Sequence, residues 1–260
     1  MSERISDRGL LEYFVVALAA MLLVLFTTGR PPQRALTVVF PPPAPQHLKG
    51  ESPVPALDLP PSPGAPELFT LYQDARNGDP VAAFDLGNIY ARGIDAPPDY
   101  AMAMRWYSRA AAQGLADAQY NLAVFYAKGL GTTKDPARAV PLFEAAAAQG
   151  LSDAQVALGL LYRDGLVGPK NYVKAWEWFS RAATQGDTDA FYLLALSYEA
   201  GLGVKRDQTE ALKWLLLAEH GGRKDPEFRE HLVTALTPAQ QDEAKRRADA
   251  FKVMPTPSAH

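Results

Sequence analysis

A block of 36 residues occurs four times in succession within this 260-residue chain, without a gap. The four blocks are residues 81–116, 117–152, 153–188 and 189–224, and a leading half-repeat covers 67–80. Equivalent positions keep one residue type, as in Leu86, Leu122, Leu158 and Leu194, in Tyr90, Tyr126, Tyr162 and Tyr198, and in Gly93, Gly129, Gly165 and Gly201. A fixed period of this length is typical of a solenoid, in which each unit buries its apolar face by stacking on its neighbours. We therefore predict one continuous core through the repeats.

Local signals divide each block into two helices. In the second block the apolar side chains of Ala118, Leu122 and Phe125 recur at helical spacing, and Gly129 follows where a left-handed residue would end the helix. The second helix then starts at an N-capping residue, which is Asp99, Asp135, Asn171 or Asp207 in the four blocks. Its aromatic position holds Trp106, Leu142, Trp178 or Trp214. We expect the repeated leucines and tyrosines, including Tyr126 and Tyr198, to lie in the core.

These residues form a pattern that resembles a known family. The pattern A-x-x-L-G/A-x-x-Y-x-x-G-x-G, followed by D-x-x-x-A-x-x-W and A-A-x-Q-G, is similar to the Sel1-like repeat, a relative of the tetratricopeptide repeat, over residues 67–224. The resemblance implies an all-α, right-handed solenoid of antiparallel helix pairs that binds protein or peptide partners, and it implies no chemistry. The first and third blocks lack the second loop glycine, since Gly93 and Gly165 are followed by Ile94-Asp95 and Leu166-Val167.

The resemblance also indicates where a partner would bind. In related helix-pair solenoids the first helix of each pair lines the concave surface, so the candidate partner-binding residues are those of this helix outside the leucine and tyrosine positions. They are Phe84, Asn88, Arg92, Tyr120, Val124, Lys128, Val156, Leu160, Asp164, Tyr192, Leu196 and Ala200. Packed helices lie about 8–10 Å apart, an interval that suits a helical or an extended peptide. We expect Tyr120 and Tyr192 to be accessible; the alternative is that the bulky members pack on the adjacent repeat.

The N-terminal part of the chain predicts a membrane anchor. After a short tail (1–9), residues 10–29 are apolar apart from Glu12, Thr27 and Thr28, and about 20 helical residues cross a hydrocarbon core of roughly 30 Å. A cleaved signal peptide is the alternative, although no small-x-small cleavage site follows the apolar run. Arginines flank the segment on both sides, so orientation depends on the short tail, which usually stays in the cytoplasm. We expect a single-pass inner-membrane protein with periplasmic repeats; the cytoplasmic orientation stays open.

The segments on either side of the repeats have simpler compositions. Residues 30–66 are rich in proline, which breaks helices and removes amide donors, so they predict a disordered linker or a proline-rich ligand for a partner. Residues 225–252 predict two capping helices, the second of which starts at a capping box, Thr237 to Gln240. Its basic residues 245–247 suit either a solvated face or a docking patch. We expect the tail, 253–260, to be disordered.

Composition and motifs exclude most chemistry. The net charge of -3 supplies no basic face for nucleic acid, and the chain has no cysteine. His220 and His231 lack metal-ligand spacing, and the Gly-x-Gly loops follow helices without a Walker lysine. We predict no metal, cofactor, small-molecule substrate or enzymatic activity. Two function classes remain: a membrane-tethered scaffold or regulator of the bacterial cell envelope, or an obligate structural subunit of a membrane complex.

Overall fold

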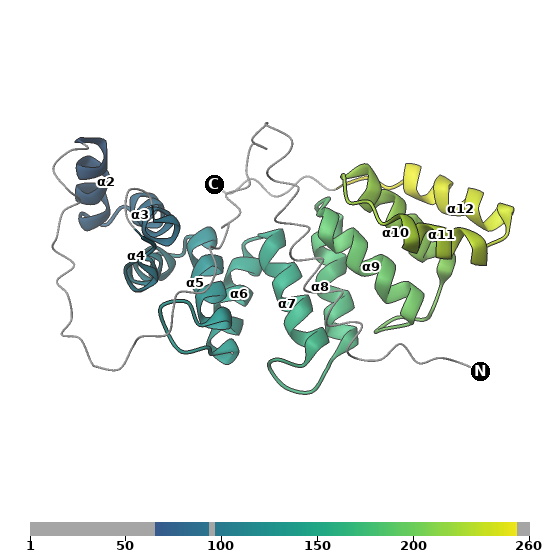
Figure 1. Cartoon of the computed structure of the whole chain (residues 1–260), viewed down its shortest axis with the longest axis horizontal. Helices are drawn as coiled ribbons and strands as arrows, with labels where there is room; N and C mark the ends of the chain where they lie inside the picture. Colours follow the sequence, from purple (N-terminus) through teal and green to yellow (C-terminus); the bar gives the residue numbers. More distant parts are fainter. Residues whose placement is uncertain (1–65, 94–96, 254–260) are drawn as a thin grey trace. The chain divides into compact units, whose positions relative to one another are not determined.

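The computed structural model describes residues 66–93 and 97–253. All eleven regular elements within these ranges are α-helices (Figure 1). They are α2 (Pro66–Arg76), α3 (Pro80–Arg92), α4 (Tyr100–Ala112), α5 (Ala116–Lys128), α6 (Pro136–Ala148), α7 (Ser152–Asp164), α8 (Tyr172–Thr184), α9 (Thr188–Ala200), α10 (Gln208–His220), α11 (Pro226–Ala235) and α12 (Pro238–Asp249). None of these helices is long and apolar enough to span a bilayer. The predicted anchor, the linker up to residue 65 and residues 254–260 lie outside the described ranges.

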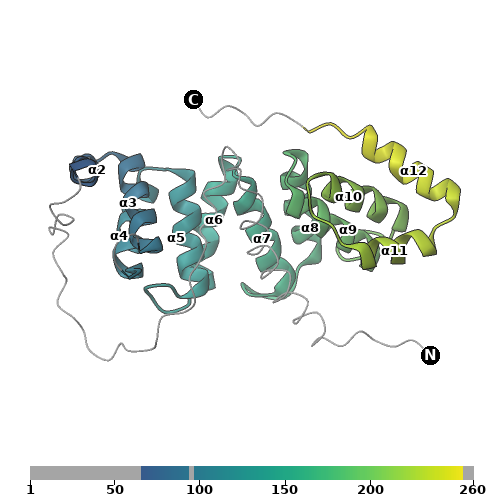
Figure 2. The same cartoon turned by 45° about the horizontal axis from the view of Figure 1, so that its top comes forward.

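Helices pack in the order in which they occur along the chain. Within the repeats α3 packs on α4, α5 on α6, α7 on α8 and α9 on α10, and each second helix also packs on the first helix of the next repeat. Helix α2 joins the array as a half-repeat on α3, and α11 and α12 both contact α10 (Figure 2). The prediction of an all-α solenoid of helix pairs is therefore confirmed.

The helix ends follow the capping signals of the sequence. The side chains of Asp99, Asp135 and Asn171 accept backbone N–H groups three residues ahead, at 2.9, 3.1 and 3.0 Å. At the other end of each first helix the glycine adopts a left-handed conformation, as at Gly129 (φ 76°) and Gly165 (φ 70°). Thr237 and Gln240 form the expected capping box at the start of α12. These caps satisfy backbone groups that a helix cannot pair internally.

One position of the second helix, a single residue beyond the tryptophan position, is buried in every repeat. The side chains at this position are buried in all four repeats: Tyr107, Phe143, Phe179 and Leu215. In the first and third repeats the ring packs over a glycine of the facing helix, because a methyl group at Gly87 or Gly159 would overlap the ring of Tyr107 or Phe179. The small residue thus sets how closely the paired helices approach.

The expectation that the repeated tyrosines lie in the core is wrong. Tyr90, Tyr126, Tyr162 and Tyr198 are each only half-buried. The position falls on the last turn of the first helix, where the next helix begins: the carbonyl of Tyr126 accepts the N–H of Asp135 (2.7 Å), and the Arg138 guanidinium lies 4.3 Å from the Tyr126 ring centroid. The tyrosine therefore closes the loop between paired helices.

Glutamines link the two helices of a repeat. Gln149 Nε2 donates to Gln119 Oε1 and Gln185 Nε2 donates to Gln155 Oε1, each at 2.9 Å. At the next equivalent position the glutamine is replaced by Phe191, which stacks on Trp214 with ring centroids 5.7 Å apart. In the last repeat a contact between aromatic rings therefore takes the place of the glutamine pair.

Candidate protein-interaction surface

The structure separates the twelve predicted partner-binding residues into three groups. Arg92, Lys128, Asp164 and Ala200 are exposed; Tyr120, Val156, Leu160 and Leu196 are half-buried; Phe84, Asn88, Val124 and Tyr192 are buried. The predicted positions therefore do not form one continuous exposed face, and the two ends of the array differ from its middle.

At the N-terminal end, Phe84 and Asn88 belong to the core. The Phe84 ring packs on Tyr107 at 5.9 Å between centroids. Asn88 Oδ1 accepts a hydrogen bond from the Tyr107 hydroxyl at 2.8 Å and one from Asn121 Nδ2 at 3.4 Å. Buried polar groups need such partners. Phe84 thus packs on the second helix of its own repeat, and Asn88 reaches the adjacent repeat through Asn121.

At the C-terminal end the expectation that Tyr192 is accessible is wrong, because only 7% of the residue is exposed. Its hydroxyl donates to Asp225 Oδ2 at 2.7 Å, and Phe228 of α11 meets its ring edge-on at 6.2 Å. The Arg223 guanidinium lies 4.0 Å from the ring centroid and also pairs with Asp189. Helix α11 and the segment before it thus cover this position.

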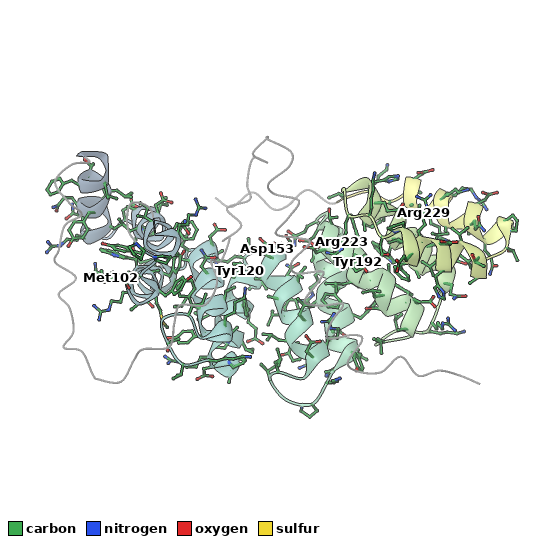
Figure 3. The ribbon with its side chains drawn as sticks, in the orientation of Figure 1. Met102, Tyr120, Asp153, Tyr192, Arg223 and Arg229 are labelled. Carbon is green, nitrogen blue, oxygen red and sulfur yellow. The ribbon has the colours of Figure 1, made fainter. Side chains whose placement is uncertain are left out.

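In the middle of the array Tyr120 keeps part of its surface. Its ring packs on Phe143 with centroids 5.6 Å apart. Burial raises the pKa of the Tyr120 hydroxyl, and the nearby charges of Asp153, Asp187 and Asp189 raise it further. The Tyr120 hydroxyl therefore lies near carboxylates; Figure 3 labels Tyr120 and Asp153.

Three of the aspartates near Tyr120 occupy equivalent positions. Asp117, Asp153 and Asp189 each lie in the first turn of a first helix, and Asp187 is the N-cap of α9. We call these four carboxylates and Tyr120 the tyrosine–aspartate surface. From the sequence, these aspartates were identified only as the first residues of their blocks. The signal that could have identified them is the Asp-Ala pair that recurs at the start of the blocks, at residues 117, 153 and 189.

The charges on this surface are only partly compensated. Asp189 pairs with Arg223, and Asp187 accepts the Ala190 N–H at 2.8 Å. Asp117 and Asp153 are exposed and form no ion pair with any residue in the described ranges. Partial burial raises the pKa of Asp153 to about 6, and the negative charges of Asp187, Asp189 and Asp117 add to the shift. A helix N-terminus favours an anion, so here loss of water and like charge outweigh the helix dipole.

These carboxylates are spread along the surface and do not converge on one point. Nowhere in residues 66–93 and 97–253 do three His, Asp or Glu side chains form a group that could hold a metal ion. The surface is therefore suited to separate contacts with a partner, through a half-exposed ring and individual carboxylates.

A comparison with protein families matches the Sel1 repeat to residues 80–115, 116–151, 152–187 and 188–222, which is more than half of the chain. The chain belongs to the Sel1 repeat family. Sel1 repeat proteins generally mediate protein–protein interaction, and their fold is typical of non-enzymatic scaffolds. None of the curated proteins matches the sequence.

Three solved structures are similar to this chain. A Sel1 repeat protein from Oxalobacter formigenes is 30% identical, with a TM-score of 0.54 over 65% of this chain and 70% of its own. A protective antigen of uropathogenic Escherichia coli with an SLR fold is 27% identical, with a TM-score of 0.44 over 70% of this chain and 47% of its own. A Sel1 repeat protein from Klebsiella pneumoniae is 24% identical, with a TM-score of 0.30 over 68% and 98% of the two chains. The first of these supports the helix-pair arrangement.

Proposed function

We propose that this Sel1 repeat protein is a non-enzymatic scaffold or regulator that binds a protein partner through the tyrosine–aspartate surface. The observation that carries the proposal is the contrast between the ends and the middle of the array. Phe84 and Tyr192 are covered by the chain itself, whereas Tyr120 is half-buried and two neighbouring carboxylates form no ion pair within the described residues. Exposed aromatic rings beside polar groups are characteristic of residues that dominate protein interfaces.

Capture of partners by the full chain tests this proposal. Tyr120→Ala removes a half-exposed ring and should weaken capture by about tenfold. Tyr126→Ala is a matched control, because Tyr126 is a half-buried tyrosine of the same helix whose ring is covered by Arg138. Equal capture by wild type and Tyr120→Ala would exclude the surface. A partner that never exchanges with added free partner would instead indicate the alternative function, an obligate structural subunit.

We also propose that the repeats are tethered to the bacterial inner membrane and lie in the periplasm. The support comes from the sequence: the apolar residues 10–29, the lack of a cleavage site after them, and the proline-rich linker. The mature chain should keep its N-terminus, fractionate with membranes, and become sensitive to protease when the outer membrane is opened. A mature N-terminus near residue 30 would exclude the anchor, and protection from protease in spheroplasts would indicate the cytoplasmic orientation.

A further inference from the structure

The last repeat binds one of its own arginines, Arg223, at a pair of side chains that recurs in an earlier repeat without an arginine. Asp189 and Tyr192 together hold Arg223: the carboxylate forms an ion pair with the guanidinium, which lies 4.0 Å from the centroid of the ring. Asp117 and Tyr120 are the equivalent pair, 72 residues earlier in the chain. The position equivalent to Arg223 is then Leu151, which carries no charge.

We propose that Asp117 and Tyr120 bind an arginine side chain of the partner protein, in the way that Asp189 and Tyr192 bind Arg223. This inference rests on the proposed function and specifies the chemistry of the partner: an arginine-bearing segment. A guanidinium suits the pair because its planar fork bonds to a carboxylate while its face stacks on an aromatic ring.

The surroundings of Asp117 support a cationic partner. Acidic side chains of α9 and α10 have basic partners: Glu199 with Arg206, Glu210 with Lys213 and Glu219 with Arg229, at 2.7, 3.2 and 2.8 Å. Asp117 and Asp153 are the exposed members of the tyrosine–aspartate surface, and neither forms such a pair within the described residues. A bound guanidinium would offset their mutual repulsion.

The repeat between the two sites shows why it does not hold a cation of its own. There the equivalent of Arg223 is Asp187, so that Asp153 faces a second carboxylate, and Val156 replaces the tyrosine. Asp153 and Asp187 therefore add negative charge beside the empty pair without completing a second site. The charge of this region is complementary to a segment with more than one basic residue.

A peptide titration tests the inference. The probe is a fluorescent Gly-Ser peptide carrying three arginines, titrated into the full chain and followed by fluorescence anisotropy. The comparison peptide carries citrulline, which has nearly the shape of arginine but no charge. We expect the arginine peptide to bind and the citrulline peptide to bind at least about tenfold more weakly. Equal affinity for the two peptides would overturn the inference.

Variants locate the binding. Asp117→Asn and Tyr120→Ala should each lower the affinity for the arginine peptide by about tenfold. Asp242→Asn, which changes an exposed carboxylate on α12, is the matched control and should leave it unchanged. Unchanged affinity in Asp117→Asn would place the peptide elsewhere. Circular-dichroism melts establish that each variant is folded.

A second variant supplies the missing arginine from the chain itself. Leu151→Arg puts a guanidinium at the position equivalent to Arg223, where it should occupy the Asp117–Tyr120 pair and exclude the peptide; Leu151→Gln should not. A folded Leu151→Arg chain that binds the peptide as tightly as wild type would contradict the inference. If a captured partner depends on Tyr120 but not on Asp117, the proposed function stands and this inference fails; if it depends on neither, the proposed function fails as well.

Discussion

At the scale of single residues, one missing methyl group controls a helix–helix contact. Gly159 lies under the Phe179 ring so closely that a Cβ atom would overlap it. Gly159→Ala should therefore lower the free energy of unfolding by about 1–3 kcal/mol, although alanine is the better helix former. Denaturant unfolding measures the loss, and adding Phe179→Leu should recover part of it. A Gly159→Ala chain as stable as wild type would show that the ring moves aside at no cost.

A single carboxylate should also give the fold a measurable pH dependence. The pKa of Asp153 is raised from 3.8 to about 6 in the folded chain. The folded state therefore holds the Asp153 proton more tightly than the unfolded state does. The stability that this proton contributes is fully present below about pH 4 and is lost as the pH rises through about 6. Asp153→Asn should remove this component and raise the free energy of unfolding at pH 7, by less than about 1 kcal/mol because the side chain is exposed.

Thermal melts between pH 4 and pH 7.5 check this expectation. The wild-type minus Asp153→Asn difference in melting temperature should change across this range. A flat difference for Asp153 would mean that its carboxylate is as well solvated in the folded chain as in the unfolded one.

At the scale of elements, the end of the array is closed by the segment after α12. The Phe251 ring lies 5.6 Å from that of Phe191 and 5.2 Å from that of Trp214. The Lys213 ammonium lies 4.0 Å from the Trp214 centroid, and Arg247 of α12 pairs with Glu210 of α10 at 2.5 Å. Ring contacts and an ion pair thus hold α12 against the last full repeat, where a further repeat would otherwise stack.

Removing this contact should loosen the last repeat first. Phe251→Ala should lower the free energy of unfolding by about 1–3 kcal/mol, below the range for a fully buried ring because Phe251 is half-buried. Hydrogen exchange should quicken in α9, α10 and α12 before it does so in α3 to α6. Phe69→Ala is the control: Phe69 is 50% exposed, so the change should cost less than about 0.5 kcal/mol. Uniform quickening along the array would contradict a local role.

The elements themselves could be predicted because their signals are local. Asp135 and Asn171 start helices and Gly129 and Gly165 end them by interactions within a few residues, so position in the sequence was sufficient. The core was harder to predict, because a repeat establishes which residues are equivalent but not the direction in which they point. The tyrosine position was therefore assigned to the core, while Phe143, one residue after the expected aromatic position, is the buried ring.

At the scale of the whole described array, equivalent positions differ in burial between the ends and the middle. Tyr120 and Tyr192 occupy the same position in their repeats, yet Tyr192 is buried because Arg223 and α11 follow it. Helix α11 lies outside the repeated pattern, and the position of Arg223 holds a residue other than arginine in each repeat that precedes it, so periodicity could not reveal the cover. The aspartates beside Tyr120 were not identified as a surface because their mutual influence arises between repeats.

A second period, twice as long as the first, is visible in the contacts between repeats. A Cβ atom at Gly131 or Gly203 would overlap the backbone at Tyr100 or Tyr172, at the joints between the first and second repeats and between the third and fourth. The joint between the second and third repeats has neither feature: Val167 takes the place of the glycine and Pro136 that of the tyrosine. Two kinds of joint therefore alternate along the chain.

Growth of such an array should then proceed in steps of two repeats. Duplicating residues 117–188 keeps every joint of a kind already present, whereas duplicating 153–188 alone sets Val167 against Tyr172. The chain with the longer duplication should melt at or above the wild-type temperature, and the one with the shorter duplication below it. Each added pair would also carry one more copy of Asp117 and Tyr120. Lengthening by duplication would thereby raise the valency of the chain for its partner one site at a time.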